Sequence, residues 1–348
     1  MPHLLPTPLV LGDNNIWPFR LAEGGWVLVD AGLDYVDGGM SSWDALTAQA
    51  RGIGCAVEDV RAVVITHEHI DHAGLAARWA EQGVAIVAMP EALPMLAAGR
   101  AAQDAIRARR FEELRLHGCP ADVLVAIEAA QRARDTHVLG WAPCPEDTLV
   151  PAQDGNTFAL EDGRTLHVIA APGHTPGNLV AFVADGEGAS TGDLCSGDTL
   201  LPTTIPTPGL QFPAYAEALA RGATVEDAHD APRWPSLPPF LRSVDRLRAL
   251  DVRRILPGHG AIVDEPQRLF AQFTEHHARR SQRAIAHLER SGASTAYEVV
   301  RGIFPRLPNE RIGQAMTEMI GHLDVLVDRG DAVQARDEDG VTRTHLAR

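Results

Sequence analysis

The sequence contains no lysine, and all 31 of its basic residues are arginine. Mechanisms that need a lysine amine, such as Schiff-base formation, are therefore excluded. The arginines are outnumbered by 46 aspartates and glutamates, which gives a formal net charge of -15. Nucleic acid is a disfavoured partner on this ground, because binding to phosphates depends on clustered basic side chains.

Cysteine and long apolar runs are also scarce. The chain has four cysteines, which lie far apart and form no CxxC pair: Cys55, Cys119, Cys144 and Cys195. This spacing favours neither a disulfide framework nor a cysteine zinc knuckle. The N-terminus lacks a basic start followed by an apolar run, and no apolar segment reaches the ~20 residues of a membrane span. We therefore expect free thiols, a cytoplasmic location and no membrane partner.

Short apolar runs alternate with helical patterns through the first third of the chain, as in an α/β protein. We predict strands at 26–29, 60–65 and 84–88 and helices at 43–52 and 73–82. Each strand runs into a loop that carries polar side chains, where α/β folds usually place their chemistry. With 348 residues, the chain is long enough for one large domain and a smaller one.

The pattern then changes several times. Residues 91–135 are rich in Ala, Arg and Leu at helical spacing and predict an inserted cap of two or three helices. Strands are expected to return at 158–160, 166–170, 179–183 and in a run up to 198. Residues 202–239 are dense in proline, which predicts a stiff extended loop. A helix at 240–250, a strand at 254–256 and a long helix at 266–291 follow.

The tail has a different character. Helices are expected at 295–304 and 309–329, and Asp339-Gly340, which is flanked by the segments 333–336 and 341–345, is a strong two-residue hairpin signal. This order resembles a winged-helix module, so we divide the chain into a domain over 1–265 and a linking helix with a winged-helix-like domain over 266–348. Residues 280–348 contain ten arginines and ten acidic residues. A neutral tail favours a scaffold beside the active site, or a homodimer contact, over a nucleic-acid reader.

One segment has a density of potential metal ligands that ordinary packing rarely requires. It reads His67-Glu68-His69-Ile70-Asp71-His72 and lies between a predicted strand and a predicted helix. Imidazole and carboxylate groups suit Zn²⁺, Mn²⁺ or Fe²⁺. In a loop, His67 and His69 can point into one pocket while Asp71 and His72 turn towards a neighbouring one.

Further candidate ligands follow other predicted strands: His174 in a Pro-Gly-His turn, Asp198 after a glycine and His259 in a second Pro-Gly-His turn. Glycine beside each of them allows the backbone to approach a metal closely. Asp193 is a rival to Asp198, and Cys195 lies near the same strand. A buried structural thiol is the simpler interpretation of Cys195.

The HxHxDH motif followed by His174, Asp198 and His259 resembles the metallo-β-lactamase superfamily. The resemblance runs from about Asp30 to His259 and implies a four-layer αβ/βα sandwich. It also implies that one metal is held by His67, His69 and His174, a second by Asp71, His72 and His259, and that Asp198 bridges the two. The Gly-Asp-Thr-Leu context favours Asp198 over Asp193 for this role, and Asp30 would support a ligand from behind.

What the resemblance implies for chemistry is a hydrolase with two metal ions per chain, zinc first, with iron or manganese as alternatives. A hydroxide that bridges the metals would attack the substrate, and Asp71 could carry a proton to the leaving group. His69 favours hydrolysis over the di-iron electron-transfer relatives, which carry glutamate in place of the second histidine.

The substrate is less clearly marked. We expect a small ester, thioester or related acyl compound, with a phosphodiesterase or ribonuclease as an alternative within the hydrolases. A mononuclear iron persulfide dioxygenase shares the same motif, and an inactive scaffold with a regulatory tail is a third possibility. Leu201 stands where lactonases carry tyrosine, and the tail does not match the glutathione-binding segment of hydroxyacyl-glutathione thioesterases. Candidate substrate contacts are Phe212, Tyr215, Arg233 and Trp234.

Overall fold

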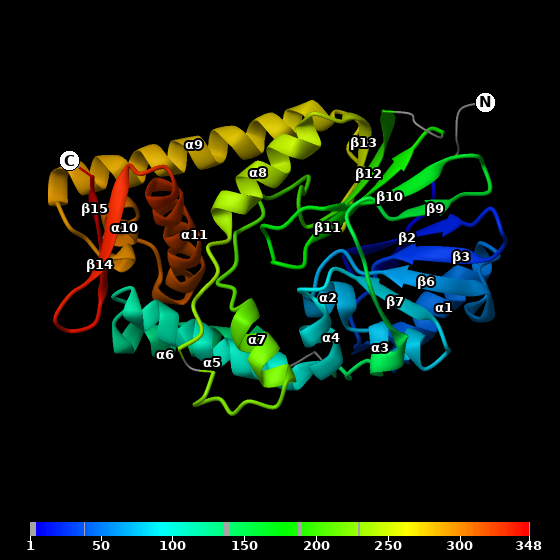
Figure 1. Ribbon diagram of the computed structural model, residues 1–348, viewed down its shortest axis with the longest axis horizontal. Helices are drawn as coiled ribbons and strands as arrows, with labels where there is room; N and C mark the ends of the chain where they lie inside the picture. The colour runs from blue at the N-terminus through cyan, green and yellow to red at the C-terminus, as the bar shows by residue number, and fades with distance from the viewer. Residues whose placement is uncertain (1–4, 38, 135–139, 187–189, 229, 348) are drawn as a thin grey trace.

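Two facing β-sheets form the centre of the first two thirds of the chain (Figure 1). The computed structural model describes residues 5–37, 39–134, 140–186, 190–228 and 230–347. The first sheet contains, in spatial order, β1 (Leu9–Leu11), β2 (Asn14–Arg20), β3 (Trp26–Val29), β6 (Val60–Val64), β7 (Ala85–Ala88) and β8 (Leu149–Pro151). The second contains β13 (Asp251–Pro257), β12 (Thr191–Gly197), β11 (Leu179–Ala184), β10 (Thr165–Ala170) and β9 (Thr157–Ala159).

Strands β3, β6, β7 and β8 are parallel, whereas β12 and β13 form the parallel pair of the second sheet. A core lies between the sheets and includes Trp17, Val29 and Val64 from one side and Val168 and Leu256 from the other. Strand β3 is buried along its whole length, because helices cover the opposite face of its sheet. Two residues each from β4 (Val36–Asp37) and β5 (Met40–Ser41) make a small separate ladder.

Helices cover the outer faces of both sheets and complete the four layers. On the first sheet lie α1 (Ser42–Gly52), α2 (Ile70–Ala73) and α3 (Ala76–Ala80); on the second lie α8 (Leu237–Arg248) and α9 (Pro266–Ser291). The Ser41 hydroxyl accepts a hydrogen bond from the Asp44 backbone and caps α1. Along α9, Leu269, Phe270, Phe273 and Ala284 recur at helical spacing on the buried side. The four-layer sandwich expected from the sequence is confirmed.

The inserted helices and the C-terminal helices pack against each other at one end of the molecule (Figure 1). The insert consists of α4 (Leu93–Ala98), α5 (Arg100–Leu116) and α6 (Ala121–Arg134), and residue 135 lies outside the described residues. The C-terminal module consists of α10 (Ala296–Ile303), α11 (Asn309–Asp328) and a hairpin of β14 (Ala332–Arg336) and β15 (Thr342–Leu346). Helix α11 contacts both α6 and α9.

Two sequence expectations need correction. The proline-rich stretch is not extended throughout, because α7 (Pro213–Ala220) forms within it. Proline fits the first turn of a helix, where its missing N–H would have no partner. The expected helix over 73–82 is divided at Gly74 and Leu75, because the Leu75 N–H donates to the Gly32 carbonyl oxygen at 2.9 Å and not to a helix carbonyl. A Cβ on Gly74 would lie 2.8 Å from the backbone nitrogen of Asp34, so this close approach requires glycine.

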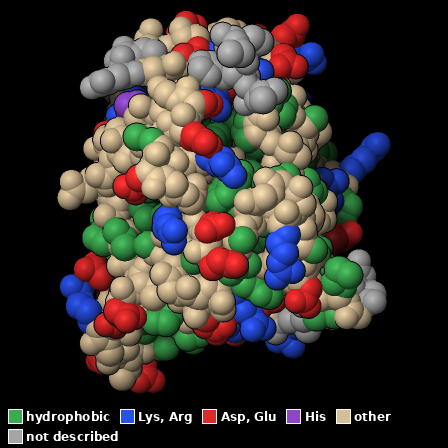
Figure 2. Space-filling model, turned by 90° about the vertical axis from the view of Figure 1, so that its right-hand side faces the viewer, with side chains coloured by type: hydrophobic (Ala, Val, Ile, Leu, Met, Phe, Trp, Pro, Cys, Tyr) green, Lys and Arg blue, Asp and Glu red, His purple; other side chains and the backbone are tan. Residues whose placement is uncertain are grey.

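On one face of the molecule, charged side chains of both signs are mixed. Figure 2 shows arginine side chains interspersed with aspartate and glutamate, without a single basic patch. No helix among the described residues is long and apolar enough to cross a membrane. The four cysteines are buried and unpaired, as the sequence predicts.

Candidate metal centre

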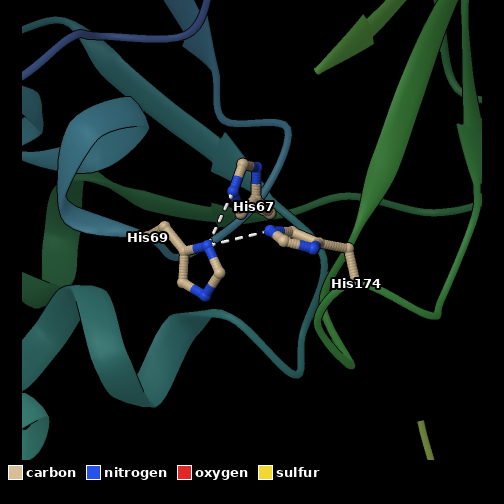
Figure 3. A group of neighbouring side chains, drawn as sticks. All are labelled: His67, His69 and His174. Carbon is tan, nitrogen blue, oxygen red and sulfur yellow. Dashed lines mark hydrogen bonds between the residues drawn. The ribbon is translucent and has the colours of Figure 1, made fainter. Parts of the chain in front are cut away.

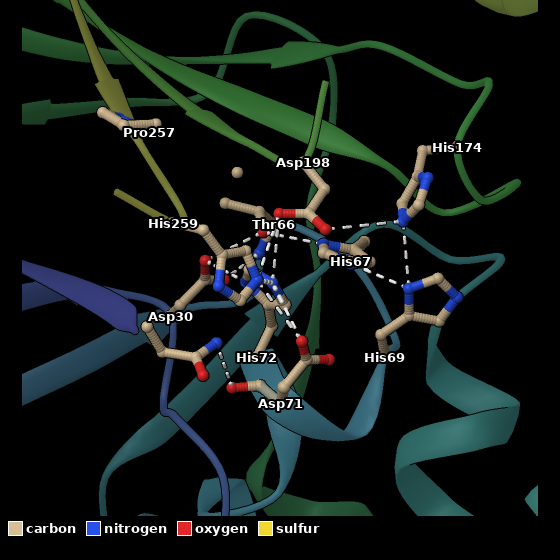
Figure 4. Close-up of polar contacts among 12 residues, drawn as sticks. Asp30, Thr66, His67, His69, Asp71, His72, His174, Asp198, Pro257 and His259 are labelled. Atoms are coloured by element: carbon tan, nitrogen blue, oxygen red, sulfur yellow. Dashed lines mark hydrogen bonds and ion pairs between the residues drawn. The ribbon is translucent and has the colours of Figure 1, made fainter. Parts of the chain in front are cut away.

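The seven candidate ligands come together at one edge of the two sheets (Figure 4). The loop after β6 carries His67 and His69, and the short helix α2 that follows it carries Asp71 and His72. The loops after β10, β12 and β13 contribute the other three. The loops are held together by backbone hydrogen bonds, including Leu179 N to Thr66 O at 2.8 Å and Gly258 N to Gly197 O at 3.0 Å. Residues separated by almost two hundred positions thereby share one site.

One cluster consists of His67, His69 and His174 (Figure 3). Nδ1 of His69 lies 3.1 Å from Nε2 of His67 and 3.0 Å from Nε2 of His174. His174 is held from behind, since its Nδ1 lies 3.0 Å from the Thr207 carbonyl oxygen. Three nitrogens that face one another in this way can all direct lone pairs at a single cation.

A second cluster consists of Asp71, His72 and His259. Nε2 of His72 lies 3.2 Å from Nε2 of His259, which in turn lies 3.3 Å from Oδ2 of Asp71. The Asp71 side chain is about one third exposed, whereas His72 is buried. One carboxylate and two imidazoles form a second ligand set suited to a divalent metal.

Asp198 lies between the two clusters. Its Oδ1 is 3.3 Å from His72 Nε2, and its Oδ2 is 3.7 Å from His174 Nε2. Oδ1 is buried and has no hydrogen-bond partner among the described residues. Gly258 closes this side so tightly that a Cβ would lie 2.7 Å from the His72 ring and 3.1 Å from Asp198 Oδ1. The nearest groups to Oδ1 are imidazole nitrogens, of His72 at 3.3 Å and of His259 at 3.5 Å, which are themselves possible metal ligands, so the residues present fit a metal ion here.

Asp30 supports His72 from behind, in the position expected from the sequence. Its Oδ2 is 2.8 Å from His72 Nδ1, and its carboxylate accepts hydrogen bonds from the backbone N–H and hydroxyl of Thr66. These contacts leave Nε2 of His72 facing the other ligands. Asp30 has a φ of 71°, a conformation that non-glycine residues rarely adopt and that the surrounding contacts must hold.

The first two residues of β2 also shape the site, and the sequence reasoning missed them. Asn15 donates from Nδ2 to the carbonyl oxygens of Pro257 and Gly260, on either side of His259. Asn14 donates from Nδ2 to the carbonyl oxygen of Asp71 at 3.0 Å. The consecutive asparagines were the available signal, because amide side chains at a tight turn commonly bond to neighbouring backbone groups.

The environment separates the protonation states of the two clusters. Burial lowers the pKa of His69 to about 3, and burial with the neighbouring imidazoles holds that of His67 well below its usual range. Burial opposes a charge on His72 as well, but the carboxylates of Asp30 and Asp198 more than offset it and raise its pKa well above 6.5. The first cluster is therefore neutral and ready to coordinate, whereas the second attracts positive charge.

The carboxylates respond in the opposite sense. Burial opposes ionisation of Asp198, yet His72 outweighs it and lowers the Asp198 pKa to about 2. The pKa of Asp71 is lowered too, since the effect of burial is exceeded by that of His72 and by a hydrogen bond with His259. Both carboxylates are thus anionic at neutral pH, as metal binding requires.

Glu68 lies within the histidine motif but is not among the facing ligand atoms. Its Oε2 accepts a hydrogen bond from the Thr175 hydroxyl at 2.6 Å, and burial raises its pKa to about 7. The pair joins the loop of His67 and His69 to the loop of His174. Thr175 therefore helps to hold the first cluster together.

The rival residues lie elsewhere. Asp193 is buried against Arg253 and Arg254, whose guanidinium groups donate to both of its oxygens. Cys195 is buried between the two sheets, where burial raises its pKa far above 9.0. These contacts keep the side chains of Asp193 and Cys195 away from the two clusters.

The proposed substrate contacts from the proline-rich stretch are mostly occupied by packing. Arg233 forms two hydrogen bonds with Asp324 at 2.7 Å and one with Glu113 at 3.0 Å. Tyr215 is buried, and the backbone of Trp234 forms an isolated antiparallel β-bridge with Gln211. Of the four, Phe212 alone lines a described cavity beside His69.

Comparisons with known proteins agree with this geometry. The family model described as the metallo-beta-lactamase superfamily matches residues 10–259. Probable metallo-hydrolase YqjP of Bacillus subtilis (strain 168) is 25% identical and aligns over 92% of this chain and 90% of its own. Atrochrysone carboxyl ACP thioesterase of Aspergillus fumigatus is 24% identical over 47% of this chain and 45% of its own.

Solved structures give the same result over the whole length. A metallo-beta-lactamase family protein from Thermus thermophilus has a TM-score of 0.68 and 25% identity, and the match covers 99% of this chain and 98% of that one. A beta-lactamase domain protein from Burkholderia ambifaria has a TM-score of 0.65 and 23% identity, with 99% and 91% covered. The chain belongs to the metallo-beta-lactamase superfamily and is a hydrolase.

Proposed function

We propose that the protein is a dinuclear metal-dependent hydrolase of small ester, thioester or related acyl substrates. In this proposal His67, His69 and His174 hold one ion and Asp71, His72 and His259 hold the other. The observation that carries it is the position of Asp198, whose two oxygens face different clusters and whose buried Oδ1 forms no hydrogen bond among the described residues. Zinc is the first expectation for both positions, because imidazole and carboxylate ligands suit it.

When bound, a pair of divalent cations would supply hydroxide at neutral pH and polarise the carbonyl oxygen of the substrate. The protein contributes the side chains that would hold the ions in place, and a carboxylate that can carry a proton. Oδ2 of Asp71 faces His259, and the side chain is about one third exposed, so it remains in reach of solvent and substrate. Asp71 is ionised and can accept the proton of the attacking water and return it to the leaving group.

A cavity of about 550 Å³ next to His69 and His174 supports a small substrate. This volume lies in the range of small-molecule sites. Helix α11 lines the cavity. This position agrees with a C-terminal part of the chain, from residue 266 onwards, that packs beside the site as a scaffold. The cavity lining contains two arginines, Arg110 and Arg311, and one glutamate, Glu310. Such a lining is too weakly basic for a polynucleotide, which needs a continuous positive groove.

The thioesterase among the relatives favours an acyl substrate over a phosphodiester. The four buried, unpaired cysteines agree with the cytoplasmic location expected from the sequence.

The decisive experiment combines elemental analysis with activity. Protein purified without added metal would be analysed for zinc, iron and manganese and assayed on matched thioester, ester and phosphodiester substrates, with oxygen consumption followed in parallel. About two zinc ions per chain and turnover of an acyl substrate are expected. One iron per chain with oxygen consumption and no hydrolysis would contradict the proposal and favour the persulfide dioxygenase.

The role of Asp71 has its own test. Asp71→Asn keeps the size of the side chain but removes the proton acceptor. We expect the variant to retain at least one metal and to lose turnover, most strongly for substrates with poor leaving groups. A variant with both metals and full turnover would exclude Asp71 as the proton carrier.

A further inference from the structure

The cavity beside His69 and His174 is enclosed by three parts of the chain that lie outside the two sheets. Its walls come from α5 and α6 of the insert, from the segment 207–211 and from α11 of the C-terminal module. Its polar lining includes Arg110, Gln131, Gln211, Gln314 and Thr317. A substrate that reaches the metal centre from this cavity must pass these side chains.

Arg110 differs from the other arginines of α5 whose contacts are described. Its Nε donates to the Leu210 carbonyl oxygen at 3.0 Å, which fixes the guanidinium plane. Arg109 instead lies over the Phe212 ring, and Arg115 lies at the surface near Glu112. Within the described part of the chain, the two terminal nitrogens of Arg110 have no hydrogen-bond or ion-pair partner.

Three carboxylates share a cavity lining with Arg110: Glu310 in the larger cavity, and Glu68 and Glu91 in a small adjoining one. Glu68 is attached to Thr175 and forms no hydrogen bond with Arg110. Burial lowers the pKa of Arg110, although the guanidinium group remains charged at neutral pH, and the charge of Glu68 acts in the opposite direction. Arg110 therefore brings a fixed cation with unused donors to the edge of the metal centre.

We propose that Arg110 binds an anionic oxygen group of the substrate, a carboxylate or a phosphate, while the metal centre hydrolyses the acyl bond. This inference rests on the proposed acyl hydrolysis and names its substrate class. The planar guanidinium offers paired N–H donors that match the oxygens of either group. A net charge of -15 repels anions at long range, so such a substrate needs a local cation of this kind.

The anionic group can belong to either half of the substrate. In an acyl compound with a free carboxylate at its far end, it stays with the acid after water has cleaved the acyl bond and the thiol or alcohol has left with a proton. In a compound whose leaving group carries phosphate, it departs with the thiol. The experiment separates the two sources.

Kinetic measurements would use thioesters of one neutral thiol, N-acetylcysteamine. The butyryl thioester is the neutral first arm. The half-thioesters of succinate, glutarate and adipate, which keep a free carboxylate, form the second arm. Butyryl-coenzyme A would be the third arm, because its acyl group is neutral and its thiol carries phosphates. The wild-type protein, Arg110→Gln, Arg110→Lys and the control Arg115→Gln would be compared. Arg115 is exposed on the same helix and lies outside the cavity lining, so its replacement tests for a general loss of charge.

We expect the wild-type protein to favour one anionic arm over the neutral thioester in kcat/KM. Arg110→Gln should reduce this preference roughly 10- to 100-fold, mainly through KM, because a charge-assisted hydrogen bond is lost. Arg110→Lys should restore part of it, and Arg115→Gln should leave it unchanged. A merely structural role would lower turnover of neutral and anionic substrates alike, and an unchanged preference in Arg110→Gln would overturn the proposal.

Direct binding makes the inference independent of turnover. Titration calorimetry would measure the dissociation constants of butyrate and glutarate. Both acids can place one carboxylate at the metals, so the difference between their affinities reports the second carboxylate of glutarate. Glutarate is expected to bind the wild-type protein at least about tenfold more tightly than butyrate, and Arg110→Gln should abolish the difference. A parallel titration with coenzyme A against N-acetylcysteamine tests the phosphate source. If no thioester is hydrolysed, the proposed function fails, whereas equal binding within both pairs in every variant overturns the role of Arg110.

Discussion

Two clusters of histidine and carboxylate side chains, one at the metal centre and one between α9 and α11, differ in their arrangement. At the metal centre, ring nitrogens face one another, and the buried Oδ1 of Asp198 forms no hydrogen bond among the described residues. Between the helices, Glu318 accepts from Arg280 at 3.0 Å and lies 2.8 Å from His276. His322 Nδ1 lies 2.9 Å from the Ser281 hydroxyl.

The difference concerns where the positive charge comes from. In the helical cluster Arg280 already neutralises the carboxylate, so the group holds two helices together without any ion. At the metal centre no arginine is described within ion-pairing distance of Asp198, and its recorded contacts are all to histidines. Histidine density alone therefore does not distinguish a metal site from a structural contact; a buried carboxylate whose charged neighbours are only imidazoles, themselves possible metal ligands, does.

Replacement of Asp198 should give the largest effect. Asp198→Asn directs an amide N–H₂ group at one of the two clusters, which repels a cation there. We expect loss of about one metal per chain and a fall in kcat of about 1000-fold, or about 4 kcal/mol of transition-state stabilisation. Elemental analysis and steady-state kinetics measure both, and full metal content with wild-type kcat would refute the bridging role.

Replacement of Glu318 should affect stability and leave the metals in place. Glu318→Gln leaves the guanidinium of Arg280 without its charge partner in a largely buried position, which should cost about 3 kcal/mol. The melting temperature is expected to fall by several degrees while metal content and kcat remain those of the wild-type protein. Loss of metal in this variant would show that the two clusters are coupled.

Replacement of Asp30 tests a residue that touches no substrate. Asp30→Asn removes the charge that holds His72 Nδ1 and should reduce metal affinity or kcat by about 10- to 100-fold, close to 2 kcal/mol. Metal titration in competition with a chelator of known affinity measures the metal dissociation constant, and steady-state kinetics measures kcat. A change confined to the melting temperature would mean that Asp30 only stabilises the fold.

The smallest expected effect is a pH dependence of the helical cluster. Burial next to His322 and His276 lowers the pKa of His277 to about 3, compared with 6.5 in the unfolded chain. The contribution of His277 to the free energy of unfolding is therefore complete above pH 6.5 and is lost as the pH falls towards 3, because the unfolded state binds a proton that the folded state excludes. At pH 5.5 the loss is about 1.4 kcal/mol.

His277→Gln has no such proton and serves as the matched variant. Hydrogen exchange of the α9 and α11 amides at pH 7 and 5.5, corrected for intrinsic exchange rates, should show a smaller acid loss in the variant. Equal losses in both proteins would mean that other groups cause the acid sensitivity.

Local signals in the sequence located most elements and brought the seven candidate ligands into one hypothesis. The limits of α9 were readable because Pro266 opens it and Gly292 follows it, and a Thr295–Glu298 capping box starts α10. The spacing of His67, His69 and Asp71 after an apolar strand was equally informative, because a loop at a strand end can aim several side chains into one space.

Features that depend on distant partners were not predictable in this way. Asn15 acquires its role from Pro257 and Gly260, more than two hundred residues away. Arg233 was expected near the substrate but is bound by Asp324 of α11, a contact that no local pattern indicates. The choice of Arg110 among several arginines of one helix likewise depends on which face of α5 the cavity meets.

The wall that α11 contributes to the cavity has a consequence for how such enzymes diversify. The candidate ligands sit in loops at the ends of strands and in the short helix α2, whereas much of the cavity lining sits on the longer helices α5, α6 and α11, which supply none of them. Substitutions on α5, α6 or α11 can therefore alter which molecules enter without disturbing the ion-binding loops. Selection for a new substrate can act on one part of the gene while the reaction itself is inherited unchanged.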